Sequence, residues 1–349
     1  MHGGDIYRNP VTLDFSVNVN PLGVPEQVRR ALTEGIRQIS AYPDPICEEL
    51  RKRIAKHFGR MSEEVLCGNG ASELLTAICR WKKWENALLM APGFSGYEKA
   101  LRASGCEIIY FLLREDEGFG LPEERFEQLC KMIADEKIQL MFLANPSNPV
   151  GRLIPKRMLR ELAKLCERTK TTIVLDECFL ELTDEPQKYS MTDILEQYPG
   201  IIVLRAFTKS FAMPGVRLGY LLCTNKESVT GIAAQLPEWN VSLPAQLAGE
   251  AAMAVWEEND YLLESRKVIL LERDFLTSEL KKRGACVYPS SANFVLFRWK
   301  DALLSERLLK RGILIRDCRD YEGLEPGCYR IAVRSHEENC ELLKNMSDL

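Results

Sequence analysis

The sequence predicts an α/β fold in which a mostly parallel sheet is covered by helices on both faces. Two patterns support this prediction. Short β-prone segments alternate with amphipathic helical segments through the middle of the chain, and each β-prone segment ends in a polar turn. Parallel neighbours need a helix-length crossover, which this alternation supplies. The β-prone runs are almost wholly apolar, as expected for strands buried on both faces.

Length and composition limit the classes of protein to consider. The chain has 349 residues, 46% of them apolar and 28% charged, which suits one large and one smaller globular domain. Lys and Arg (46) nearly balance Asp and Glu (50), so the net charge of -4 argues against nucleic acid or anionic membranes as partners. The apolar runs are too short to span a bilayer, and no secretory signal opens the chain. We therefore expect a cytoplasmic protein.

The cysteines indicate a reducing compartment. The chain holds 12 cysteines and 3 histidines, but no two cysteines form a C-x-x-C pair of the kind that metal sites use. Six of them lie among apolar neighbours, namely Cys67, Cys79, Cys106, Cys166, Cys178 and Cys223. We predict buried free thiols and no metal site.

The N-terminal segment, His2 to Gly23, is rich in Gly, Asn and Pro and is predicted to be an extended arm that does not pack. Pro25 then stands at a first helical position, followed at helical spacing by Val28, Leu32, Ile36 and Ile39. A Tyr-Pro-Asp-Pro break separates this helix from a second one, residues 46–58, which Gly59 ends.

Four β-prone segments follow, each leading into a turn and most into a helix. They span residues 65–67, 87–90, 138–144 and 171–175. After residue 237 the pattern changes. Two helical stretches run from about 244 to 283, and strands at 293–297, 313–316 and 329–333 alternate with helices near 302–311 and 336–346. We predict an arm and helix (1–44) that join a small α+β domain (241–349), with a large domain (45–240) between them.

Candidate functional residues stand just after the predicted strands. Lys209 lies on a predicted loop after the apolar run 201–204, and Asn148, Asp176 and the turn 68–72 hold similar places. Ligands of open parallel sheets bind beyond the carboxyl ends of the strands. Taken alone, Lys209 is an ordinary solvated lysine. Taken with the other strand ends, it is a candidate for a Schiff base with a carbonyl cofactor, with Arg217 holding a phosphate.

Each residue has a chemical role if the cofactor is pyridoxal phosphate. The turn with Gly70, Ala71 and Ser72 opens a helix, so its N–H groups can hold the phosphate, although such a turn can also be purely structural. Asp176 can pair with a protonated pyridine nitrogen, or it can cap a helix or form a salt bridge. Asn148 can donate to the ring hydroxyl or serve the turn alone. Phe94 can stack on the ring or belong to the core.

Five motifs resemble the class I and II aminotransferase superfamily of fold type I pyridoxal phosphate enzymes: GNGASE, APGFSGY, NPSNPVG, LDECFLEL and FTKSFAMPGVRLGY. The resemblance spans nearly the whole chain and implies a large domain with a seven-stranded sheet. It implies that Lys209 carries pyridoxal 5'-phosphate and that Thr208 and Arg217 reach its phosphate. It also implies that Tyr42 reaches the cofactor of a neighbouring subunit in a homodimer. Phe179 stands where many members have a tyrosine that binds the ring oxygen.

Within this superfamily the chain resembles the branch of histidinol-phosphate aminotransferases and threonine-phosphate decarboxylases of cobalamin synthesis. His2-Gly3-Gly4, residues 14–23, 315–318 and 329–334 favour the decarboxylases. The implied reaction is decarboxylation of threonine phosphate, and transamination is the alternative. A regulator that has this fold but no catalytic activity would normally carry an added DNA-binding module. We see no segment of the sequence that remains for such a module.

The implied substrate is a small amino acid phosphate with two anionic ends. Arginine matches carboxylate and phosphate groups in bidentate fashion, so Arg316 and Arg330 are the candidate partners. The resemblance adds His2 and Asn18 as phosphate contacts, although His2 can equally be a disordered terminal residue. Arg334 can equally be a surface residue.

Overall fold

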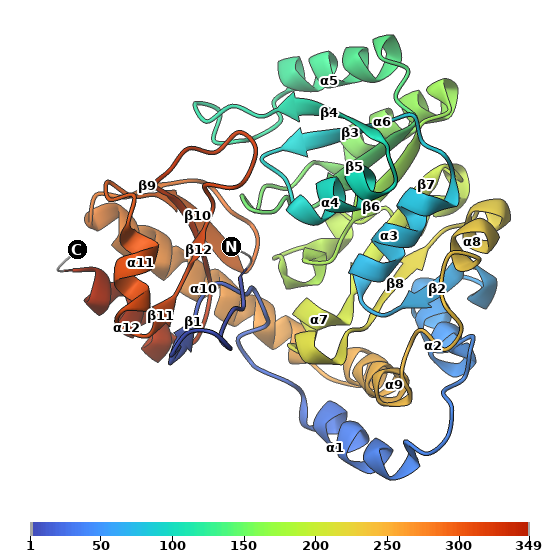
Figure 1. Ribbon diagram of the computed structural model, residues 1–349, viewed down its shortest axis with the longest axis horizontal. Coiled ribbons are helices and arrows are strands. Elements are labelled where there is room, and N and C mark those ends of the chain that lie inside the picture. Colours follow the sequence, from blue (N-terminus) through green and yellow to red (C-terminus); the bar gives the residue numbers. More distant parts are fainter. Residues whose placement is uncertain (1–2, 348–349) are drawn as a thin grey trace.

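The computed structural model describes residues 3–347 and contains a seven-stranded sheet in the order β2-β8-β7-β6-β5-β3-β4. The strands are β2 (Val65–Gly68), β3 (Asn86–Ala91), β4 (Glu107–Leu112), β5 (Leu140–Ala144), β6 (Thr172–Asp176), β7 (Ile201–Ala206) and β8 (Gly219–Leu222). Neighbouring strands are parallel, except that β8 runs antiparallel to both β2 and β7. The prediction of a mostly parallel α/β sheet is confirmed (Figure 1).

Helices cover both faces of this sheet because its strands are apolar on both sides. Along β5, Met141 and Leu143 belong to one buried cluster, whereas Leu140 and Phe142 belong to another. The first cluster includes residues of α5 (Glu123–Asp135) and α6 (Lys156–Thr169), and the second includes residues of α3 (Ala71–Trp81), α4 (Ser95–Ala103) and α8 (Lys226–Ala233). Successive residues of a strand point to opposite faces, so a continuous apolar run requires cover on both.

A second, antiparallel sheet has the order β12-β13-β10-β9. It comprises β9 (Cys286–Val287), β10 (Phe294–Arg298), β12 (Arg316–Asp317) and β13 (Cys328–Ala332). It packs with α10 (Tyr261–Lys282), α11 (Leu304–Leu309) and α12 (His336–Met346) to form the small unit on the left of Figure 1. This antiparallel sheet and the helices packed on it match the predicted α+β unit.

The N-terminal arm is packed, contrary to the sequence prediction. Strand β1 (Leu13–Asp14) pairs in parallel with β11 (Ile313–Leu314), and Phe15 is fully buried in the core of the small unit. The buried side chain of Asn20 donates to the Ser210 backbone oxygen at 2.8 Å. The prediction failed because a Gly- and Asn-rich segment has no periodicity, and its partners lie far away in the sequence.

Helix α1 (Glu26–Gly35) packs on α9 (Leu243–Glu258), which also contacts α2 (Glu48–Phe58). The predicted stop of α2 at Gly59 is confirmed, since Gly59 adopts the left-handed conformation with a φ of 62°. Helix α9, which belongs to the predicted small domain, therefore contacts α2 of the predicted large domain. The division into residues 1–44, 45–240 and 241–349 stays a prediction.

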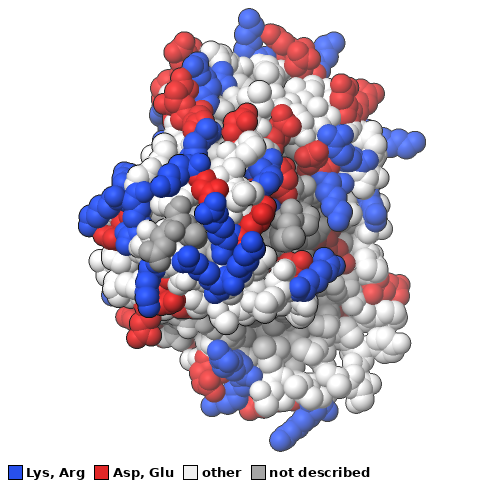
Figure 2. All heavy atoms as spheres, turned by 60° about the vertical axis from the view of Figure 1, so that its left-hand side comes forward, with Lys and Arg blue, Asp and Glu red and all other residues white. Residues whose placement is uncertain are grey.

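The mixed charge of the surface and the burial of the cysteines agree with what the composition predicts. Basic side chains lie among acidic ones over the face drawn in Figure 2. All six cysteines predicted to be buried are buried and free. Within residues 3–347, no helix is long and apolar enough to cross a membrane, and no group of three or more His, Cys, Asp or Glu side chains is placed to hold a metal ion.

We expect Gly219→Ala to destabilise the fold, because an added Cβ would lie 2.4 Å from the Ala71 backbone nitrogen and 2.9 Å from the Gly70 carbonyl carbon. Backbone atoms cannot yield as a flexible side chain can, so the free energy of unfolding should fall by about 1–3 kcal/mol. Urea denaturation measures this change. Gly215→Ala is the matched control, since a Cβ there meets nothing within 4 Å. Equal midpoints for the two variants would contradict this packing.

Candidate active site

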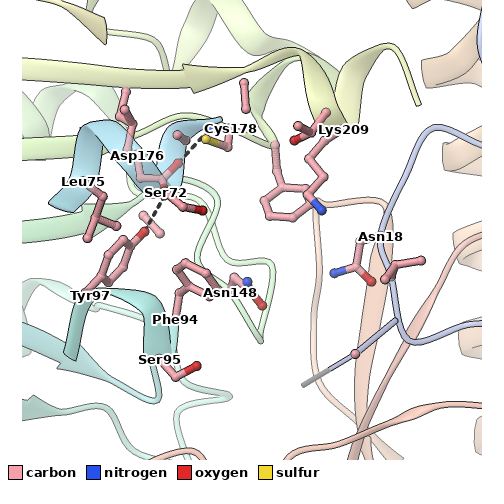
Figure 3. A pocket seen from close by; sticks show the side chains of 18 of the residues that line it. Asn18, Ser72, Leu75, Phe94, Ser95, Tyr97, Asn148, Asp176, Cys178 and Lys209 are labelled. Atoms are coloured by element: carbon pink, nitrogen blue, oxygen red, sulfur yellow. Dashed lines mark hydrogen bonds between the residues drawn. The ribbon is translucent and has the colours of Figure 1, made fainter. Parts of the chain in front are cut away.

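A cavity of about 240 Å³ lies at the carboxyl ends of the central strands, between the large sheet and the small unit (Figure 3). It brings together most of the residues that the sequence singled out: Asn18, Ala71, Ser72, Phe94, Asn148, Asp176, Thr208, Lys209, Arg217, Arg316 and Arg330. In Figure 3 the side chains of Asp176, Ser72 and Tyr97 lie on one side of the pocket, and those of Lys209 and Asn18 lie on the other.

Lys209 lies on the one-turn helix α7 (Phe207–Ser210), directly after β7, and not on the predicted loop. A helix of one turn is too short to produce a periodic apolar pattern, so the sequence could not reveal it. Burial, reinforced by the positive charge of Arg330, lowers the pKa of the Lys209 ammonium to about 8. The lowered pKa favours the neutral amine, which is the form that attacks a carbonyl carbon.

Asp176 ends β6, and its carboxylate is held by two donors. The Tyr97 hydroxyl donates to Oδ2 at 2.6 Å, and the Cys178 backbone N–H donates to Oδ1 at 2.9 Å. Burial and the nearby Asp176 charge raise the pKa of Tyr97, which keeps its hydroxyl a donor. Two fixed donors orient the carboxylate, and they leave it able to pair with a cationic ring nitrogen in the cavity.

The turn before α3 has the geometry of an anion site. Gly70 has a φ of 75°, and α3 starts at Ala71, whose backbone N–H belongs to the first turn of the helix. A Cβ on Gly70 would lie 2.5 Å from Nη2 of Arg217, so only glycine lets the guanidinium approach this turn. Arg217, Thr208 and Ser72 line the same cavity. These groups suit a phosphate.

Arg330 connects the small unit to the large sheet. From β13 its guanidinium donates to Oδ1 of Asn148 and, at 3.0 Å, to the Ser16 backbone oxygen. Because Oδ1 of Asn148 is an acceptor, its amide Nδ2 remains able to donate into the cavity. Among residues 3–347, Oδ1 of the buried Asn18 has no hydrogen-bond partner, and neither does Nε of Arg330. A polar ligand would satisfy such buried atoms.

Among the described residues, two predicted site residues, Tyr42 and Gly70, do not line this cavity. The Tyr42 side chain is 79% exposed and packs on Trp239, with ring centroids 4.7 Å apart. His2 lies outside the described residues. Gly70 contributes indirectly, because its lack of a side chain leaves room for the Arg217 guanidinium. Arg334 pairs with Glu338 at 2.6 Å and donates to the Asp14 backbone oxygen, which is a structural role.

Tyr97, Ser16 and Tyr321 also line the cavity, although no pattern in the sequence marked them as site residues. Tyr97 stands three residues after Phe94 in the first turn of α4, so its place near a strand end was the one available signal. The ring centroid of Phe179 lies 5.7 Å from Nζ of Lys209. An apolar ring therefore stands at the position where many family members have a tyrosine.

A buried ion network lies beneath the cavity. Arg205 on β7 donates from Nε to Glu177, the residue after Asp176, at 3.1 Å, and from Nη1 to Glu181 at 2.5 Å. Ser190 donates to Glu177 at 2.9 Å. The side chains of Arg205 and Glu177 are 4% and 0% exposed. Breaking such a pair leaves an uncompensated buried charge, which costs about 3–5 kcal/mol.

Comparison with known proteins agrees with this geometry. Residues 10–346 match the family model for aminotransferase class I and II. The chain is 35% identical to a threonine-phosphate decarboxylase of Salmonella typhimurium over 98% of this chain and 94% of that protein. It superposes on the histidinol-phosphate aminotransferase of Clostridium acetobutylicum with a TM-score of 0.88 and 32% identity, covering 96% and 98% of the two chains. For the L-threonine-O-3-phosphate decarboxylase of Porphyromonas gingivalis the TM-score is 0.82, with 26% identity and coverage of 96% and 98%.

We expect the Lys209 amine to titrate with a midpoint near pH 8 when nothing is bound to it. Its pKa lies below the ordinary value, so the neutral form becomes dominant as the pH rises through 8 and not through 10.5. At pH 8 about half of it should be neutral, a fraction roughly a hundredfold larger than for a lysine with an ordinary pKa, and its rate of reaction with a small acylating reagent should rise with pH through that midpoint.

Competitive labelling followed by peptide mass analysis measures this rate, with the exposed Lys83 as internal control. Arg330→Gln removes a positive charge and should move the midpoint upward. A midpoint near 10.5 in the unaltered protein would contradict the assigned environment.

Proposed function

Because the chain belongs to the class I and II aminotransferase family, we propose that it is a pyridoxal phosphate-dependent decarboxylase of L-threonine O-3-phosphate. The reaction releases carbon dioxide and leaves (R)-1-amino-2-propanol O-2-phosphate, a step of cobalamin biosynthesis. The observation that carries the proposal is the joint cavity. It combines the amine of Lys209 and the carboxylate of Asp176 with two buried arginines, Arg316 and Arg330, which suit a doubly anionic amino acid.

The residues of the cavity fit the cofactor. Pyridoxal 5'-phosphate supplies an aldehyde carbon for amines and an electron-withdrawing ring that stabilises negative charge at the substrate Cα. In our proposal Asp176, oriented by Tyr97, binds the protonated ring nitrogen, and Asn148 donates to the ring hydroxyl. Phe94 packs on the ring, and Gly70, Ala71, Ser72, Thr208 and Arg217 form the phosphate site.

Lys209 has two functions in this proposal. Its neutral amine would hold the cofactor through the aldehyde carbon, and its lowered pKa would let the amine accept or return a proton at Nζ near neutral pH. Returning that proton to the substrate Cα after loss of carbon dioxide completes the reaction. The Arg330 charge that lowers this pKa would also bind the substrate carboxylate, so substrate binding and proton transfer are linked.

The substrate contacts come from three segments. Arg330 and Arg316 bind the two anionic ends, and Asn18 adds a phosphate contact from the arm. His2 is assigned the same role from the family resemblance. The arm and the small unit together cover the cavity, which keeps water from the reacting carbon.

A transaminase of the histidinol-phosphate type is the second candidate. The higher TM-score with the C. acetobutylicum aminotransferase than with the P. gingivalis decarboxylase favours it. Both reactions use the same cofactor contacts, and the outcome depends on which Cα bond stands perpendicular to the ring. Threonine phosphate and serine phosphate differ by one methyl group, which a pocket discriminates only weakly.

We also propose that the protein is a cytoplasmic homodimer. Tyr42 would then reach the cofactor phosphate of the neighbouring subunit, as in the family. Its exposure supports this role, as does the exposure of the apolar side chains Ile36, Ile39 and Ile46 in the same segment.

The purified protein should show the visible absorption band of a cofactor joined to a lysine, and Lys209→Ala should lose it. Absorption spectra after dialysis make this comparison, with Lys226→Ala as a control at a position remote from the cavity. A colourless unaltered protein that cannot take up pyridoxal phosphate would refute the proposal.

Incubation with L-threonine O-3-phosphate should release carbon dioxide with no keto acid present. Trapped radiolabelled carbon dioxide measures the reaction, and L-threonine is the matched control without a phosphate. If turnover requires 2-oxoglutarate and no carbon dioxide appears, the transaminase is correct.

We expect Arg330→Ala to raise KM for the substrate more than 10-fold, because a charged hydrogen-bonded partner is lost.

A further inference from the structure

Arg316 on β12 is held by a carboxylate of its own chain. Its side chain is 3% exposed, and Nη2 donates to both oxygens of Asp320, at 2.8 and 3.0 Å. Nη1 donates to the Asp317 backbone oxygen at 2.8 Å, and the guanidinium carbon lies 5.0 Å from the centroid of the Tyr321 ring. The cation assigned to an anionic substrate group therefore already has a counter-charge.

Asp320 approaches Arg316 from the edge of the active-site cavity. Tyr321 lines that cavity, whereas Asp320 lines a small neighbouring pocket together with Ser95 and Tyr110. The Asp320 side chain is 43% exposed, in contrast to the buried guanidinium that it binds. The carboxylate is thus open to solvent, whereas the guanidinium is enclosed by protein.

This asymmetry matters because a buried guanidinium requires a counter-charge at every stage of a binding cycle. Leaving it uncompensated costs several kcal/mol, whereas an exposed carboxylate is well hydrated. Although partial burial opposes ionisation, the hydrogen bond and the charge from Arg316 lower the pKa of the Asp320 carboxyl, so it is an anion at neutral pH. A ligand phosphate at Arg316 competes with this anion for the same N–H groups.

We propose that Asp320 is an exchangeable counter-anion of Arg316, which the phosphate of a ligand displaces and which returns as the phosphate leaves. The inference rests on the proposed function only in that the ligand carries a phosphate. Decarboxylation leaves the phosphate on the product, so the contact that helps substrate binding also retains the product. The returning carboxylate lowers the affinity for both and makes release of the product faster.

The test measures phosphate binding and not turnover. The holoenzyme of the unaltered protein and of Asp320→Asn is titrated with inorganic phosphate, with L-threonine O-3-phosphate and with L-threonine, and binding is followed by the change in visible absorption and by thermal shift. Glu322→Gln is the matched control, because Glu322 is an exposed acid two residues away in the same segment. It removes the same charge without touching Arg316.

We expect Asp320→Asn to lower Kd for both phosphate-bearing ligands by about 2- to 5-fold, the range for a partly exposed ion pair. L-Threonine binding and the Glu322→Gln variant should show no change. In an Arg316→Gln background, Asp320→Asn should give no gain, which identifies Arg316 as the group through which Asp320 acts. Asp320→Ser provides a second variant should the first fail to fold.

Unchanged or weaker phosphate binding in Asp320→Asn would overturn the proposal, because Asp320 would then merely orient Arg316. An equal gain for L-threonine would overturn it too, since the effect would be general electrostatics. The failure of the proposed function has a different signature. In that case phosphate affinity rises in the variant as expected, but no carbon dioxide is released from L-threonine O-3-phosphate by any of the proteins.

Discussion

The buried ion pairs of Arg205 are the interaction on which the site depends. Arg205 joins β7 to Glu177 at the end of β6 and to Glu181 beyond it, and these two strand ends carry Lys209 and Asp176. The spacing between the amine and the carboxylate is therefore set from below by charges that no ligand touches. An apolar core would allow the strand ends to shift, whereas a fully hydrogen-bonded charge network accepts only one arrangement.

The cavity is completed from outside the sheet by the arm and the small unit. The Asn20 N–H donates to the Lys209 backbone oxygen at 3.0 Å, and Arg330 binds both Ser16 and Asn148. The arm thus contacts both Lys209, which we propose to carry the chemistry, and Arg330, which we propose to bind the substrate. Electrostatics link the two as well, since Arg330 contributes to the lowered pKa of Lys209.

The sequence predicts well whatever depends on local pattern. Asp176, Asn148 and Lys209 could be found because each follows an apolar run, and the ends of parallel strands meet at one edge. Tyr97 could not be assigned, because its partner Asp176 lies 79 residues further along the chain. The packing of Phe15 and the pairing of Arg316 with Asp320 also depend on tertiary contacts that no periodicity encodes. The antiparallel direction of β8 likewise depends on a short connection that has no periodic signal.

The pairing of β1 with β11 also fixes the order in which the molecule can be assembled. Thr12 donates to the Gly312 backbone oxygen across 300 residues of sequence, so Thr12 leaves the ribosome long before its partner has been made and can pair only afterwards. Until then the arm does not cover the cavity, even if the large sheet has already formed. The chain consequently becomes competent to close over a ligand only after residues 312–314 have been synthesised.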